Sequence, residues 1–118
     1  ASVPHAAEWP YGVVVATGDH LPDLHGLDDV RRDDLAGVLV DVFGRLDRLF
    51  AAPMPYMAWW HQRPTDGGDW PSAHVHLHVA PLRRAPGTAR YVAAAEVGAG
   101  VYFNPVEPRA AAAALRDA

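Results

Sequence analysis

The feature that most constrains this chain is a run of three histidines that alternate with aliphatic residues, from Ala73 to Val79. Successive side chains of a β-strand point to opposite faces of the sheet. The run therefore predicts a strand with His74, His76 and His78 on one face and aliphatic side chains, which need a core, on the other. Neighbouring imidazoles in such a row lie about 7 Å apart along the strand. A row of this kind can bind a metal ion or provide a nucleophile with its supporting groups.

The length and charge of the chain limit the classes of protein to which it can belong. With 118 residues we expect a single domain, residues 1–118, large enough for one hydrophobic core. The net charge of −4 argues against nucleic-acid binding, and the lack of cysteine excludes disulfides, thiolate metal sites and a cysteine nucleophile. No apolar run reaches the about 20 residues that a membrane helix needs, and no signal peptide is visible. We therefore expect a cytoplasmic protein that binds neither membranes nor nucleic acids.

The remaining sequence pattern predicts an α+β fold. Apolar residues repeat at three- and four-residue spacing between Asp28 and Phe50, which predicts one long helix with a single apolar stripe. Short β-branched or aromatic runs predict further strands, at residues 12–16, 56–61 and 101–103. Residues 89–96 are compatible with a strand or a helix, and Pro108 is placed to open a C-terminal helix. We expect an antiparallel sheet of about five strands with the long helix packed across it.

The aromatic run that ends at His61 is close in sequence to the histidine strand, and strands that follow each other in sequence tend to pair. Antiparallel pairing could bring His61 near His74 and His76. Neutral imidazoles from two neighbouring strands suit zinc or iron, with Asp66, Asp69 or water able to serve as a fourth ligand. The competing chemistry is nucleophilic, since an imidazole can attack an α-phosphate and form a covalent nucleotidyl intermediate. The two interpretations exclude each other at His76, which cannot be a ligand and a free nucleophile at once.

Several segments of the sequence carry a resemblance to a known family. The run from His74 to Ala80 is similar to the H-φ-H-φ-H-φ-φ motif of the histidine triad superfamily, in which φ is apolar and the middle histidine, here His76, is the nucleophile. The surrounding segments resemble the C-terminal half of the galactose-1-phosphate uridylyltransferases. Those segments are Trp60-His61-Gln62-Arg63-Pro64, Pro81-Leu82-Arg83, Glu96-x-Gly98-x-Gly100, Asn104-Pro105 and Ala110–Arg116.

The resemblance implies a histidine-triad-like α+β fold and a role in moving UMP between UDP-glucose and galactose 1-phosphate. It implies a site for zinc or iron at His61, His74 and His76, completed by a glutamate from the N-terminal half of the enzyme. It also implies contacts with the hexose of a UDP-hexose substrate held in the neighbouring subunit. These contacts fall on Arg90, Tyr91 and Glu96.

The covalent nucleophile of the family lies in a His-Pro-His motif of the N-terminal half, and this sequence contains no such motif. The resemblance therefore implies a nucleotidyltransferase domain that is inactive without an N-terminal half. We expect such a half, or a homodimer mate, as its partner. Two alternatives stay open. A free-standing histidine triad nucleotide hydrolase or transferase would use His76 as its nucleophile, and a structural or regulatory half would support a partner without catalysis.

Overall fold

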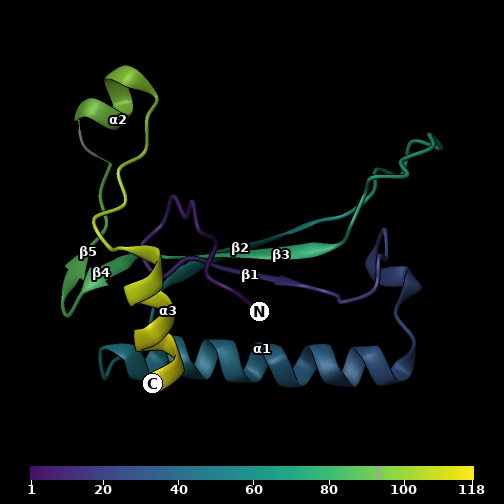
Figure 1. Ribbon diagram of the computed structural model, residues 1–118, viewed down its shortest axis with the longest axis horizontal. Coiled ribbons are helices and arrows are strands. Elements are labelled where there is room, and N and C mark those ends of the chain that lie inside the picture. Colours follow the sequence, from purple (N-terminus) through teal and green to yellow (C-terminus); the bar gives the residue numbers. More distant parts are fainter. Residues whose placement is uncertain (93) are drawn as a thin grey trace.

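The computed structural model describes residues 1–92 and 94–118, which form a three-stranded sheet, a β-hairpin and helices (Figure 1). In chain order the elements are β1 (Val13–Ala16), the short 3-10 helix η1 (Leu24–Gly26), α1 (Asp29–Leu49), β2 (Tyr56–His61), β3 (His76–Pro81), β4 (Arg83–Ala85), β5 (Thr88–Ala89), α2 (Ala94–Ala99) and α3 (Pro108–Asp117). Figure 1 shows α1 running along one face of the sheet, with α3 crossing near its C-terminal end. The sheet and α1 together form the frame on which the functional side chains are placed.

The three-stranded sheet has the order β1-β3-β2, so β3 is central and both neighbours are antiparallel to it. The register pairs His61 with His76 and Trp59 with His78 across β2 and β3. Leu77, between the two histidines, is buried in the core. Because side chains alternate along a strand, the histidines and Trp59 lie on the face of the sheet that is opposite this core.

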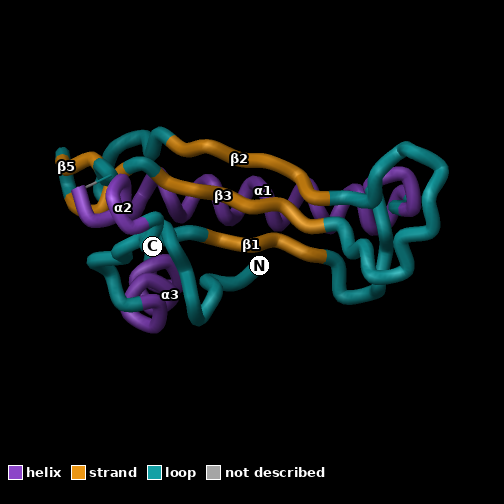
Figure 2. Tube along the Cα trace, turned by 90° about the horizontal axis from the view of Figure 1, so that it is seen from above, coloured by secondary structure: helices purple, strands orange, loops and turns teal. Residues whose placement is uncertain are grey.

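Helix α1 covers the apolar face of the sheet, and Figure 2 shows it behind the strands when the molecule is seen from above. The Asp28 side chain accepts a hydrogen bond from the Arg31 N–H at 2.8 Å and caps the positive end of the helix. Ala51 follows the helix with a φ of 50°, a left-handed conformation that ends it. The core between α1, α3 and the sheet consists of the buried side chains Val13, Val15, Val42, Leu46, Met54, Leu77, Val79 and Leu115.

The predicted α+β class and the long helix are confirmed, but the strands do not form one five-stranded sheet. Three strands form the main sheet, and β4 and β5 form a separate hairpin. Gly87 allows this tight turn with a φ of 64°, a conformation that suits glycine. In the part of the chain that the structure describes, no helix is long and apolar enough to span a bilayer.

The segment before α3 differs from the sequence prediction. Residues 101–103 form no strand in the structure, and one reason is that a side chain takes the place of a neighbouring strand. The backbone N–H of Phe103 donates to Glu96 Oε1 at 3.0 Å. The sequence pattern of residues 89–96 is compatible with a strand or a helix. In the structure Ala89 ends β5 and Ala94 begins α2, and Ala93 lies outside the described residues.

Candidate metal centre

Three imidazoles meet on the face of the sheet opposite α1. Pairing of β2 with β3 brings His61 directly opposite His76, and His78 lies two residues further along β3. One ring nitrogen from each histidine lies within 4.8 Å of the other two, and the ring centroids are 4.8 to 5.1 Å apart. Side-chain rotation would be needed to bring all three nitrogens to the about 2.0–2.1 Å that zinc prefers. We refer to His61, His76 and His78 as the histidine cluster, which offers three nitrogen donors to one metal ion.

A backbone hydrogen bond sets the orientation of His76. Its Nδ1 lies 2.7 Å from the carbonyl oxygen of His74. A carbonyl oxygen can only accept, so Nδ1 carries the proton and Nε2 of the neutral ring keeps its lone pair. Nε2 is therefore the atom that His76 offers to a metal ion or to a phosphorus atom.

Trp59, on the same face of β2, contacts two members of the histidine cluster. Its indole N–H donates to His61 Nε2 at 2.8 Å. Its ring stacks on His78, with the centroids 5.5 Å apart and the planes at 15°. The sequence predicted Trp59 as an exposed residue of an aromatic strand, but not these contacts, because they depend on the register between β2 and β3.

The surroundings of His78 favour its neutral form. Burial lowers the pKa of His78 below its ordinary value of 6.5, and the nearby charges of His61 and His76 lower it further. The carboxylate of Glu8 acts in the opposite direction. Since neutral imidazole is the form that binds metal ions, the lowered pKa suits a metal ligand.

The structure places His74 apart from the histidine cluster. Strand β3 begins only at His76, because the N–H of the residue before it donates to a carbonyl in the loop between β1 and η1. The ring of His74 is turned to the end of β1, with Nε2 3.0 Å from Thr17 Oγ1 and 3.1 Å from the Thr17 carbonyl oxygen. Of the three ligands expected from sequence, the structure therefore brings together His61 and His76, and it adds His78 where His74 was expected.

The carboxylates considered as a fourth ligand lie in the long loop between β2 and β3. Asp66 Oδ1 accepts hydrogen bonds from the Trp70 indole N–H at 2.9 Å and from the Gly68 N–H at 3.0 Å. These bonds, the Trp70 bond first, hold the pKa of Asp66 below its ordinary value. Among the described residues no carboxylate, Asp69 included, joins the histidine cluster. A fourth ligand would have to be water or a group from another polypeptide.

The three residues expected to contact substrate do not form a common surface. Arg90 and Glu96 lie against each other, 2.8 Å apart, and both side chains are buried. The Arg90 guanidinium also lies over the Trp9 ring, 4.1 Å from its centroid. Tyr91 is exposed, and its hydroxyl accepts a hydrogen bond from Arg84 at 3.4 Å. Of the three, Tyr91 is the one whose side chain is open to a ligand.

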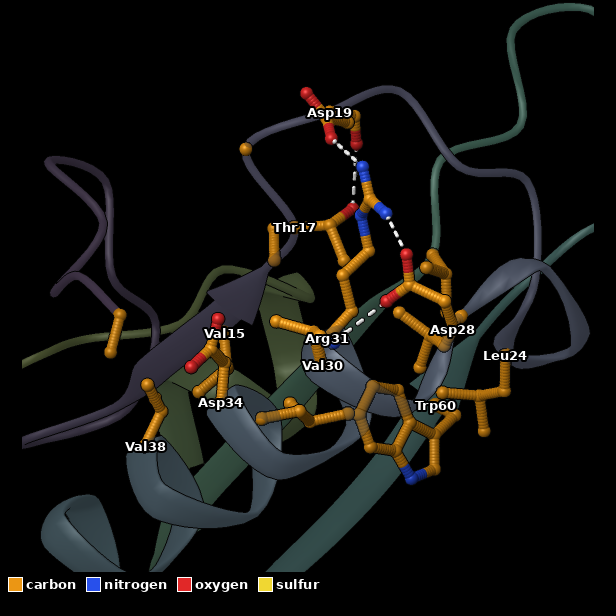
Figure 3. Close-up of a pocket in the computed structure, with 16 residues that line it drawn as sticks. Val15, Thr17, Asp19, Leu24, Asp28, Val30, Arg31, Asp34, Val38 and Trp60 are labelled. Carbon is orange, nitrogen blue, oxygen red and sulfur yellow. Dashed lines mark hydrogen bonds and ion pairs between the residues drawn. The ribbon is translucent and has the colours of Figure 1, made fainter.

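A hollow lies on the other side of the sheet from the histidine cluster, between the end of β1 and the first half of α1 (Figure 3). Its volume is about 610 Å³, and Val15 and Trp60 provide part of an apolar wall. At its rim Arg31 is bound to the carboxylates of Asp19 and Asp28. Because the walls are largely apolar and this charge is already paired, we place the candidate site at the histidine cluster instead.

Fold and site together define a class of protein. A long helix covers one face of an antiparallel sheet, and the opposite face carries the histidine cluster. The central strand of that sheet contains alternating histidines. These are the features of a histidine-triad-like domain.

Comparison with known proteins identifies the family within this class. Residues 1–98 match the family described as galactose-1-phosphate uridyl transferase, C-terminal domain. Over 99% of its length the chain is 31% identical to the galactose-1-phosphate uridylyltransferase of Thermotoga maritima, of which it covers 37%. The chain belongs to the galactose-1-phosphate uridyl transferase C-terminal domain family.

Solved structures agree with this assignment. The chain superimposes on a uridylyltransferase with a TM-score of 0.89 and 30% identity, covering 98% of this chain and 36% of the other. It also superimposes on an ADP-glucose phosphorylase from Arabidopsis thaliana with bound ADP-glucose, with a TM-score of 0.84 and 29% identity over 99% of this chain and 36% of the other. The chain spans about a third of the length of these relatives.

Proposed function

We propose that this chain is the C-terminal half of a UDP-glucose–hexose-1-phosphate uridylyltransferase. The complete enzyme would move UMP between UDP-glucose and galactose 1-phosphate. The observation that carries the proposal is the histidine cluster on the sheet of a chain that resembles these enzymes over almost its whole length. In this proposal the chain contributes the scaffold, a metal site and contacts with a UDP-hexose, and it acts in the cytoplasm.

The histidine cluster is the proposed metal site, for zinc or iron. Imidazole nitrogens are ligands that both metals accept. The unprotonated Nε2 of His76 and the lowered pKa of His78 support this use of the cluster. A carboxylate from an N-terminal half, or water, would complete the ligand set. A cation held there would fix this face of the sheet to that half.

The proposed partner is an N-terminal half that carries the His-Pro-His nucleophile, a motif absent from this sequence. Strand β2 supports such a partner, because all six of its residues are exposed and it is an edge strand of the described sheet. An edge strand offers backbone hydrogen bonds to another chain, and the exposed Met57 and Trp59 add apolar surface. The same edge suits a second copy of this chain in a homodimer.

The proposed contact with the substrate hexose is Tyr91, on the exposed side of its segment. Arg84 lies beside it, with the guanidinium 5.4 Å from the centroid of the Tyr91 ring. Arg90 and Glu96 would act indirectly, because their buried pair holds the segment that contains Tyr91. Tyr91→Ala should therefore weaken hexose binding in the complete enzyme and leave the fold intact.

The test is a UMP exchange assay between UDP-glucose and galactose 1-phosphate. We expect no turnover by the chain alone and turnover when an N-terminal half with an intact His-Pro-His motif is added. The matched control is the same N-terminal half with the nucleophilic histidine replaced by alanine, which should bind the chain and stay inactive. A complex that forms with the intact half and exchanges no UMP would contradict the proposal.

A second function is favoured by one observation, the hydrogen bond that leaves Nε2 of His76 unprotonated. With Nδ1 held by the His74 carbonyl, this ring is oriented to attack an α-phosphate. A nucleotide hydrolase or transferase of this kind would need no N-terminal half. Turnover of nucleotides by the chain alone, lost in His76→Ala and kept in His74→Ala, would favour it over the proposal above, because His74→Ala preserves the carbonyl.

A further inference from the structure

Trp59 lies where it can control access to the histidine cluster. It is 38% exposed on β2, and it contacts two of the three cluster residues. Its indole N–H donates to His61 Nε2, and its ring stacks on His78. The indole nitrogen is a donor only, so Trp59 touches the site without being a metal ligand itself.

The hydrogen bond from Trp59 fixes which nitrogen of His61 carries the proton. Since the indole can only donate, Nε2 of His61 must be the lone-pair nitrogen, and Nδ1 of the neutral ring carries the proton. A metal ion bound at Nε2 would take the lone pair that the indole now uses. A metal ion bound at Nδ1 would leave the proton on Nε2, facing the indole N–H. This bond is therefore incompatible with metal binding by the neutral ring through either nitrogen.

We propose that Trp59 is a cap on the histidine cluster, which competes with a metal ion for His61 and releases this residue when the metal binds. The proposal rests on the metal site proposed above and adds a control element to it. A hydrogen bond between neutral groups contributes modestly to a folded protein, so the competition is graded. Removing the indole N–H should tighten zinc binding by about twofold to tenfold.

The position of Trp59 allows it to move without disturbing the core. Strand β2 is at the edge of the sheet, and Trp59 shares the face of the histidine cluster. Its neighbour Trp60 lines the hollow on the opposite face, beside α1. Rotation of the Trp59 side chain would break its contacts with His61 and His78 and leave the buried aliphatic cluster unchanged.

The test compares Trp59→Phe with the wild-type chain. Phenylalanine keeps an aromatic ring beside His78 and removes the N–H. Trp70→Phe is the matched control, because Trp70 also donates its indole N–H, to Asp66, in the loop between β2 and β3. Calorimetric titration with zinc gives the affinity, and long-range ¹H–¹⁵N NMR shows which nitrogen of His61 carries the proton before and after zinc is added.

We expect Trp59→Phe to bind zinc about twofold to tenfold more tightly than wild type, and Trp70→Phe to bind it equally. We also expect wild-type His61 to carry its proton on Nδ1 without zinc. Equal or weaker binding by Trp59→Phe, with zinc bound by wild type, would overturn the cap and leave the metal site intact. A proton on Nε2 of metal-free His61 would also overturn the cap. No zinc binding by wild type or by Trp59→Phe would overturn the metal site and the cap together.

Discussion

Arg90 and Glu96 form an ion pair, with 2.8 Å between Nη2 of the arginine and Oε1 of the glutamate, and the two side chains are only 3% and 4% exposed. The pair connects three segments of the chain. Arg90 donates to the Glu8 carbonyl at 3.3 Å and lies over Trp9, and Glu96 accepts the N–H of Phe103. Desolvation of both charges in such a buried pair costs free energy. Removal of one partner leaves the other charge buried and takes away its opposite charge. Its main effect in this fold is therefore to fix the segment that precedes α3.

Arg90→Met should lower the free energy of unfolding by about 3–5 kcal/mol, because the Glu96 carboxylate loses its buried guanidinium. Urea denaturation followed by circular dichroism would measure the change. Arg84→Met is the control, since Arg84 is less buried and contacts the exposed Tyr91, and it should cost less than about 1 kcal/mol. A double variant with methionine at both 90 and 96 should recover part of the loss. Equal effects of the Arg90 and Arg84 variants would contradict this role.

Helices and strands are predicted well where the residues that define them, such as a capping residue or an apolar stripe, lie within the same segment of sequence. The long helix, predicted from Asp28 to Phe50, is observed as Asp29–Leu49, because a capping aspartate and an apolar stripe define it. Strand β2 has the predicted bounds. The segment at residues 101–103 could not be predicted in this way. Its backbone is bound by the side chain of Glu96, a contact that depends on tertiary structure.

The candidate site shows the same division between local and tertiary information. Alternation placed His74, His76 and His78 on one face of a strand, and the expected pairing of His61 with this strand is confirmed. The choice between His74 and His78 depends on where β3 begins and on the turn of the His74 ring toward Thr17. The alternating pattern predicts neither the start of β3 nor the orientation of the His74 ring. Only the three-dimensional structure therefore shows which three histidines form the cluster.

His78→Ala and His74→Ala should therefore differ in metal binding. We expect zinc to raise the melting temperature of the wild-type chain and of His74→Ala, because both keep the three cluster nitrogens. His78→Ala should lose most of this shift, since only two of the three ligands remain. Scanning fluorimetry with and without zinc, supported by elemental analysis, would measure the effect. The reverse order, with the shift lost in His74→Ala and kept in His78→Ala, would favour the trio expected from sequence.

The lowered pKa of His78 predicts a pH dependence of the metal-free protein. In the folded state burial, and then the charges of His61 and His76, hold this pKa below the ordinary 6.5. As the pH falls below 6.5 the unfolded chain binds the proton more readily than the folded one, so stability declines, and above 6.5 this contribution is complete. In the presence of a chelator, the melting temperature should fall more steeply from pH 7 to pH 5.5 in wild type than in His78→Gln. Parallel curves for the two proteins would contradict the assignment.

The exposed surface along β2 predicts association through this edge of the sheet. Met57 is 45% exposed there, and in the described structure the outer side of β2 has no neighbouring strand. A lysine at such a position is a device by which edge strands avoid pairing. We expect the wild-type chain to sediment at micromolar concentration as a dimer or, when an N-terminal half is present, as a complex with it. Met57→Lys should shift both species toward monomer without lowering the free energy of unfolding.

Val40→Lys is the control for this experiment. Val40 is 75% exposed on α1, so this substitution adds the same charge outside β2. It should leave sedimentation unchanged. Obligate interfaces bury upwards of about 2,000 Å², so one added charge at the true edge should have a clear effect, whereas a charge elsewhere should have little. Equal dissociation in both variants would point to a general effect of charge. A wild-type monomer that also ignores an N-terminal half would contradict the proposed partner, because the edge of β2 would then need no other chain.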